Sequence, residues 1–146
     1  MRILLAVDGS EYTQKAIHFL LAHKGFTDTD NTLCVVNVQA PVPNPVQRML
    51  GSAQVAAYHS EESDEALEPV QKYLESCGLR CQYVAVVGNP KEDILAAAKK
   101  EQSDMIVMGT HGHGLIGRAL MGSVAQRVVT DSEIPMLLVK QRLSAW

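Results

Sequence analysis

The sequence predicts an α/β fold: an open, doubly wound sheet of five parallel strands with helices on both faces. Five short segments are apolar at both odd and even positions, which is typical of strands buried under helices on two sides. They alternate with segments that carry helical spacing or helix caps, and such alternation with right-handed crossovers gives a parallel sheet. The predicted strands are residues 2–7, 33–38, 81–87, 104–109 and 135–140.

Four helical segments are expected, one between each pair of successive strands. Ser10 is the predicted N-cap of the first helix, which ends near Gly25. The second has an apolar face over residues 66–77, and Pro69 must either kink it or lie in its first turn. Residues 41–52, which include three prolines, are expected to form a loop that leads into this helix.

The third helix has the strongest start signals. Asn89 supplies an N-cap, Pro90 suits the first turn, and Glu92 is the predicted capping-box partner. This helix is expected to run to about Glu101. A fourth is expected over about residues 123–131.

Length and composition favour one globular domain over residues 1–146. The chain is 47% hydrophobic and 20% charged, as globular proteins are. Its net charge of −3 provides no basic face for nucleic acid. Its longest aliphatic runs are far shorter than the ~20 residues that span a bilayer. We therefore expect a cytoplasmic protein without nucleic-acid or membrane partners, whose three cysteines are reduced.

Residues 109–123 point most directly to a function, because they hold five glycines and no acidic side chain. Glycine-rich turns between a strand and a helix can cradle phosphate with backbone N–H groups. The GxGxxG at residues 112–117 follows the fourth strand rather than the first and lacks an acidic residue at the end of the next strand, which argues against a dinucleotide site. Gly117, Gly122 and Ser123 have the spacing of a P-loop without its lysine, which argues against a P-loop NTPase.

A third spacing remains, Gly109-x2-Gly112-x9-Gly122-Ser123. With AVDGS at residues 6–10, MGTHG at 108–112, GSVAQRVV at 122–129 and IPMLLV at 134–139, it resembles the ATP-binding branch of the universal stress protein family. The resemblance covers essentially the whole chain except the weakly similar residues 41–63. It implies a Rossmann-like fold of the adenine nucleotide alpha hydrolase type.

The resemblance also implies a ligand, ATP or the related AMP or ADP, with or without magnesium. Asp8 would lie near the ribose or contact a phosphate-bound magnesium ion, and Val38 would offer backbone groups to the adenine edge. The glycines and Ser123 of the signature would hold the ribose and phosphates. The nucleotide-binding residues expected in all are Ala6, Val7, Asp8, Val38, Gly109, Thr110, Gly112, Arg118, Gly122, Ser123 and Val124.

The chemistry of the residues agrees with an anion site there. Gly122 and Ser123 begin a helix, whose free N–H groups and partial positive charge favour a phosphate. Arg118 and Arg127 are the charged residues between positions 105 and 130, so this segment is locally positive.

The family resemblance further implies a homodimer and a role as a stress-response regulator or sensor. The expected interface is the last strand, whose apolar edge favours pairing with a second copy. Its residues are Pro135, Met136, Leu137, Leu138, Val139 and Lys140. Because no P-loop lysine and no water-positioning carboxylate accompany the loop, we expect at most slow ATP hydrolysis or autophosphorylation.

Alternative interpretations stay open from the sequence alone. The five-strand pattern and the hydroxyl-rich DGSEYT at residues 8–13 are also compatible with a flavodoxin-like FMN carrier. The same fold without a ligand could serve as a protein-interaction module. His111 and His113 form an HxH pair, but no third metal ligand lies near them in the sequence, so a metal site is disfavoured.

Overall fold

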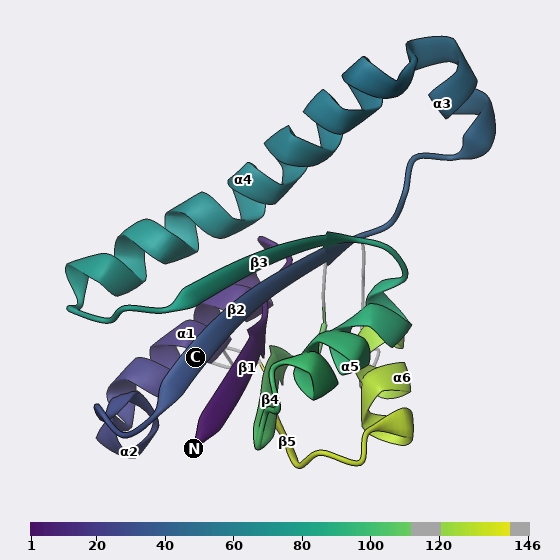
Figure 1. Cartoon of the computed structure of the whole chain (residues 1–146). Coiled ribbons are helices and arrows are strands. Elements are labelled where there is room, and N and C mark those ends of the chain that lie inside the picture. The colour runs from purple at the N-terminus through teal and green to yellow at the C-terminus, as the bar shows by residue number, and fades with distance from the viewer. Residues whose placement is uncertain (112–120, 141–146) are drawn as a thin grey trace, which may run out of the picture.

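The computed structural model describes residues 1–111 and 121–140. They form a five-stranded parallel sheet in the order β3-β2-β1-β4-β5 (Figure 1). The predicted fold class is therefore confirmed. The strands are β1 (Arg2–Ala6), β2 (Thr32–Gln39), β3 (Gln82–Val87), β4 (Met105–Gly109) and β5 (Met136–Val139).

The order of the strands reverses beside β1. From β1 the chain adds β2 and then β3 on one side, and it crosses to the other side for β4 and β5. Leu5 pairs in parallel register with Val35 of β2 and with Val107 of β4, so the carboxyl ends of the three central strands lie together. In open α/β sheets ligands bind at such a reversal point.

Helices cover both faces of the sheet (Figure 1). On one face, α1 (Glu11–Ala22) and α4 (Ser52–Ser76) pack on the sheet through buried side chains that include Ile17 and Leu74. On the other face, α5 (Pro90–Lys100) and α6 (Ser123–Asp131) do so through residues that include Ile94 and Val128. The short α2 (Lys24–Thr27) follows α1.

The expected loop over residues 41–52 is wrong, because Asn44–Leu50 form a helix, α3. Pro45 lies in its first turn, where no N–H group is needed for helical hydrogen bonding. Gly51 separates α3 from α4 with a φ of +82°, a conformation that glycine adopts without strain. With the first half of α4, α3 extends beyond the edge of the sheet (Figure 1).

Pro69 lies in the interior of α4 rather than in a first turn, so the second helix begins well before the region predicted from its apolar face. Proline removes one helical hydrogen bond and crowds the preceding turn. The ribbon of α4 nevertheless continues across this position (Figure 1). Packing of Ala66, Val70 and Leu74 on the sheet supports the helix on both sides of the proline.

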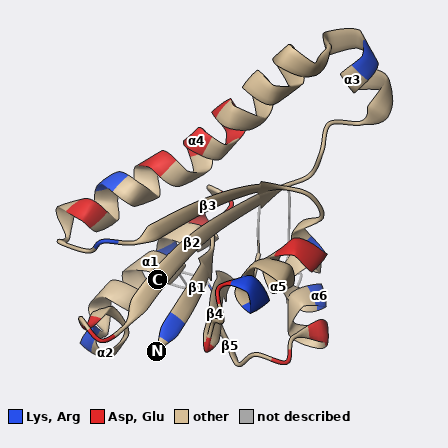
Figure 2. Ribbon diagram, viewed as in Figure 1, with Lys and Arg blue, Asp and Glu red and all other residues tan. Residues whose placement is uncertain are grey.

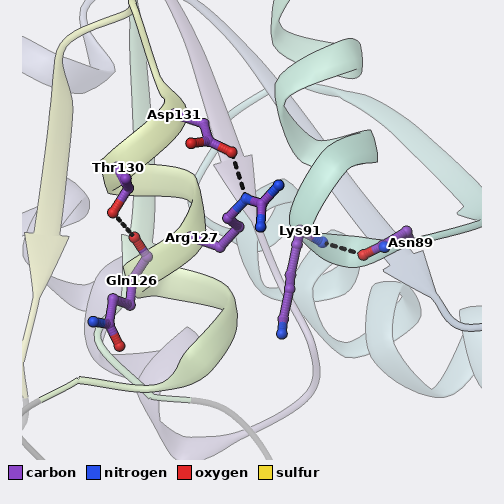
Figure 3. Close-up of polar contacts among 6 residues, drawn as sticks. All are labelled: Asn89, Lys91, Gln126, Arg127, Thr130 and Asp131. Atoms are coloured by element: carbon purple, nitrogen blue, oxygen red, sulfur yellow. Dashed lines mark hydrogen bonds and ion pairs between the residues drawn. The ribbon is translucent and has the colours of Figure 1, made fainter.

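The N-cap of α5 agrees with the sequence, except for one partner. The Asn89 side-chain oxygen accepts a hydrogen bond from the Lys91 N–H at 2.9 Å (Figure 3). The Asn89 N–H donates to Oδ2 of Asp93 at 2.8 Å, so Asp93 takes the place predicted for Glu92. Ser10 occupies the N-cap position of α1, but its side chain makes no capping hydrogen bond.

Replacing Asn89 with alanine is expected to lower the free energy of unfolding by about 1 kcal/mol, because the cap to the Lys91 N–H is lost. Urea denaturation followed by circular dichroism measures the change. Asn44→Ala is the matched control, since Asn44 is exposed and has no hydrogen-bonded side chain within the described part of the chain. Equal stability of the two variants would contradict the cap.

The three cysteines are free thiols in different surroundings. Cys34 is buried in β2, and this burial raises its pKa to about 11. Burial also raises the pKa of Cys81, whereas Cys77 is exposed at the end of α4. Only a thiolate reacts readily with alkylating agents, so burial and a raised pKa both protect a thiol.

Iodoacetamide at pH 8 is therefore expected to alkylate Cys77 at least about tenfold faster than Cys34 in the folded protein. Peptide mass spectrometry at successive times gives the two rates. In urea, where burial is lost, the rates should converge. A Cys34 rate that matches Cys77 without denaturant would show that β2 is not held in the sheet.

Candidate functional site

A cavity of about 270 Å³ lies at the carboxyl ends of β1, β2 and β4, where the strand order reverses. Helices α5 and α6 form its other wall. Its volume is near the lower end of the range for small-molecule pockets. The structure brings most of the sequence-predicted residues to its lining, namely Ala6, Val7, Asp8, Val38, Gly109, Gly122, Ser123 and Val124.

Asp8 is held in place by the turn that joins β1 to α1. Its Oδ1 accepts the Ser10 N–H at 2.9 Å and the Thr13 hydroxyl at 3.0 Å. The Asp8 N–H in turn donates to Oγ1 of Thr13 at 3.1 Å. Gly9 allows this tight turn with a φ of +82°. Both of these hydrogen bonds to the carboxylate end on Oδ1, so Oδ2 has no hydrogen-bond partner among the described residues.

Gly109 ends β4 directly against α1. A Cβ atom added there would lie 2.5 Å from Cβ of Tyr12 and 3.1 Å from the carbonyl carbon and oxygen of Tyr12. Only glycine fits between the strand and the helix at this distance. This close packing of β4 on α1 holds Gly109 in position, and Gly109 forms part of the cavity wall.

Gly122 and Ser123 bring the start of α6 to the cavity. Gly122 is buried and is the N-cap residue, and Ser123 is exposed as the first helical residue. The Gly122 N–H donates to the Thr110 carbonyl at 2.6 Å, which ties the start of α6 to the end of β4. The following N–H groups of the first turn are available to an anion.

Thr110 does not line the cavity, although it was predicted as a binding residue. It is buried, and its N–H donates to the Val139 carbonyl at 3.1 Å while its carbonyl accepts from Gly122. Its Oγ1 lies 2.9 Å from Nδ1 of His111. Thr110 therefore holds β5, α6 and His111 together behind the cavity.

Seven lining residues were not predicted. His111 belongs to the glycine-rich segment, and its ring lies 4.9 Å from the ring of Tyr12, measured between centroids. Pro90 was recognised only as a helix start. The full set is Thr13, Val36, Pro90, Ile94, Met108, His111 and Ala125. Most of these side chains are apolar, so the cavity combines apolar walls with polar groups at Asp8, Thr13, His111 and Ser123.

Two predicted nucleotide-binding residues, Gly112 and Arg118, lie outside the described residues, as does His113. Across residues 1–111 and 121–140 no cluster of three or more His, Cys, Asp or Glu side chains has the arrangement of a metal site. Asp8 is the acidic residue that the cavity offers to a cation within that part of the chain.

A neighbouring cavity of about 340 Å³ between α5 and α6 shares Ser123 with the first. Arg127 pairs with Asp131 one turn further along α6, and Lys91 of α5 lies beside this pair (Figure 3). Lys91 makes no ion pair within the described part of the chain. Lys91 lines this cavity together with Ser123, so it adds a positive charge near the start of α6. Lys and Arg are blue in Figure 2, where their distribution over the fold can be followed.

The predicted interface strand is the edge strand of the sheet. β5 comprises Met136–Val139, so Pro135 and Lys140 flank it rather than belong to it. One side of β5 pairs with β4, and no strand of the sheet among the described residues pairs with its other side. Met136, Leu137, Leu138 and Val139 are all partly exposed, which leaves an apolar edge open.

The fold and the cavity define an open α/β protein of the Rossmann-like class, with a ligand-sized cavity where the strand order reverses. The chain belongs to the universal stress protein family, whose model matches residues 1–140. This match confirms the family that the sequence motifs, including the glycine spacing, indicated. Among the described helices none is long and apolar enough to cross a membrane.

Individual relatives are similar over nearly the whole chain. Universal stress protein MJ0531 of Methanocaldococcus jannaschii is 34% identical over 142 residues, covering 96% of this chain and 82% of the relative. The solved structure of MJ0577, from the same organism, is 29% identical with a TM-score of 0.83, over 98% of this chain and 97% of that one.

Two more distant family members were solved with nucleotides. A protein from Arabidopsis thaliana with AMP bound is 17% identical with a TM-score of 0.66, over 98% of this chain and 93% of that one. A universal stress protein in complex with cAMP is 21% identical with a TM-score of 0.59, over 96% of both chains. At these identities the likeness concerns the fold.

Proposed function

We propose that the protein binds an adenine nucleotide, ATP in particular, in the cavity at the carboxyl ends of β1, β2 and β4. The observation that carries the proposal is the convergence of Asp8, Gly109, Gly122 and Ser123 on one cavity from separate parts of the chain. Family membership and the nucleotide-bound members of the same fold support it.

The lining suggests how the nucleotide lies. The apolar end of the cavity, with Val38 of β2 and Ile94 of α5, suits the adenine ring. Asp8 reaches the ribose or a magnesium ion with its free Oδ2. The first turn of α6 at Ser123 receives the phosphates, since its N–H groups and partial positive charge favour an anion.

Regulation by binding, rather than rapid catalysis, is the role that this set of residues supports best. Asp8 is the one carboxylate among the described lining residues, and its Oδ1 already accepts two hydrogen bonds. Rapid phosphoryl transfer needs both charge neutralisation at the phosphates and a group that orients the attacking water. Single-turnover ATP cleavage near 1 s⁻¹ or faster, as in typical enzymes, would overturn this part of the proposal.

Acid extraction of the purified protein, followed by nucleotide chromatography, tests the ligand directly. We expect an adenine nucleotide in the extract and a thermal shift when ATP and magnesium are added to the stripped protein. An absorbance scan separates the flavodoxin-like alternative, because bound FMN is yellow. If neither an adenine nucleotide nor a thermal shift is found, the interaction-module interpretation replaces this proposal.

We also propose that the protein is a cytoplasmic homodimer formed through β5. The apolar edge of this strand is open in the single chain, and a second copy would cover it by pairing across a twofold axis. Leu137→Lys is expected to shift the dimer toward monomer in sedimentation velocity at micromolar concentration. Val129→Lys, on the exposed face of α6, is the control. A wild-type monomer would contradict the interface.

A further inference from the structure

A second cavity, of about 290 Å³, lies between α1 and α4, on the sheet face opposite α5 and α6. We call it the α1–α4 groove. The turn after β1 closes one end through Gly9 and Ser10. Thr13 lines both this groove and the nucleotide cavity. The two cavities are therefore neighbours that open on different faces of the sheet.

Ser10 gives the groove a polar group that the fold itself does not satisfy. The side chain is 7% exposed, and its Oγ finds no hydrogen-bond partner within the described part of the chain. Ser10 occupies the N-cap position of α1 without capping it. Oγ is covered from solvent where it stands, but turning it toward the groove breaks no hydrogen bond among the described residues, and a ligand atom there would supply the missing partner.

The walls of the groove are mainly apolar. Ile17 of α1 and Ala66 and Val70 of α4 are buried beside it. At the other end, the rings of His18 and Tyr73 meet edge to face, with their centroids 5.8 Å apart. An aromatic ring fits such walls, since aromatic pairs prefer edge-to-face or offset contacts.

The negative charge that lines the groove favours aromatic molecules with a positive charge over those with a negative charge. Glu65 is the one carboxylate among the described lining residues, and neither lysine nor arginine lines the groove there. The part of α4 around it is also rich in acidic residues (Figure 2). An anionic ligand would meet repulsion, whereas an ammonium group can pair with Glu65 and lie against the Tyr73 ring.

We propose that the α1–α4 groove is a second binding site, for a small aromatic amine. The aromatic ring lies between Ile17 and Val70, and the ammonium group pairs with Glu65. With its side chain turned toward the groove, Ser10 supplies a further hydrogen bond at the end of the groove. The groove and the nucleotide cavity are separate spaces that share Thr13, so the site is tested first on the nucleotide-free protein.

Three matched probes test the site on the nucleotide-free protein: phenethylamine, the neutral 2-phenylethanol and the anionic phenylacetate. We expect phenethylamine to bind about tenfold more tightly than phenylacetate, with the alcohol between them, in titrations followed by ¹H–¹⁵N NMR. The shifts should map to residues of the groove. Equal binding of the three probes, or shifts at the nucleotide cavity alone, would overturn the proposal.

Two variants at exposed positions of α4 test whether Glu65 is the carboxylate that pairs with the ammonium group. Glu65→Gln is expected to weaken phenethylamine binding about three- to fivefold, as for an exposed ion pair, and to leave 2-phenylethanol binding unchanged. Glu68→Gln is the matched control, because Glu68 does not line the groove. Ser10→Ala should weaken the alcohol and the amine alike. If Glu65→Gln and Glu68→Gln weakened the amine equally, a general negative field rather than this site would explain binding.

Discussion

Gly109→Ala is expected to destabilise the protein by about 1–3 kcal/mol, although alanine is the smallest possible change. The new Cβ would lie 2.5 Å from Cβ of Tyr12, closer than real Cβ contacts allow, and a tight 3.1 Å from the Tyr12 carbonyl oxygen. β4 is a central strand and α1 is packed on the sheet, so neither can move away without disturbing buried contacts of Ile17 and Val107. Urea denaturation gives the change in unfolding free energy.

Two controls make this result specific. Gly25→Ala places a Cβ where no atom lies within 4 Å and should keep wild-type stability or gain slightly. Tyr12→Ala combined with Gly109→Ala should not restore stability, because the contacts are with Cβ and the backbone of residue 12 rather than with the ring. Wild-type stability of Gly109→Ala would mean that α1 does not press on the end of β4.

The sequence was sufficient to predict the sheet because the strands are buried on both faces. Each predicted strand overlaps an observed one, and the limits of α6 at Ser123 and Asp131 agree with the prediction. The prediction failed for residues 41–52, which were expected to form a loop but include the helix α3. None of the residues of α3 is buried, so no apolar periodicity marks that helix, and its prolines indicated a loop instead.

The candidate site could be predicted where it depends on strand ends and glycine spacing. Asp8 and Gly109 directly follow or end buried strands, and parallel strands bring such positions to one edge of the sheet. Pro90 and Ile94 could not be assigned to the cavity, because the sequence does not say which helix packs beside which strand end. Thr110 was wrongly assigned to the cavity because it directly follows Gly109 in the sequence. Its backbone instead bonds to Val139 and Gly122, so adjacency to a lining residue did not predict its place.

Gly122→Leu is expected to abolish nucleotide binding. Gly122 is buried, lines the cavity and precedes the first turn of α6. Its φ of −69° is open to any residue, so the backbone accepts leucine, but the added side chain must share the space proposed for the phosphates. At a ligand concentration near 100 times the dissociation constant, binding stabilises the wild type by about 2.7 kcal/mol, and the variant should lose this gain.

Thermal denaturation with and without ATP and magnesium measures that loss, and two comparisons separate it from damage to the fold. Gly25→Leu adds the same side chain at an exposed glycine and should keep the full shift. Gly122→Ala adds less volume and should show an intermediate shift if the phosphates lie against this residue. A full shift in Gly122→Leu would place the nucleotide away from the start of α6.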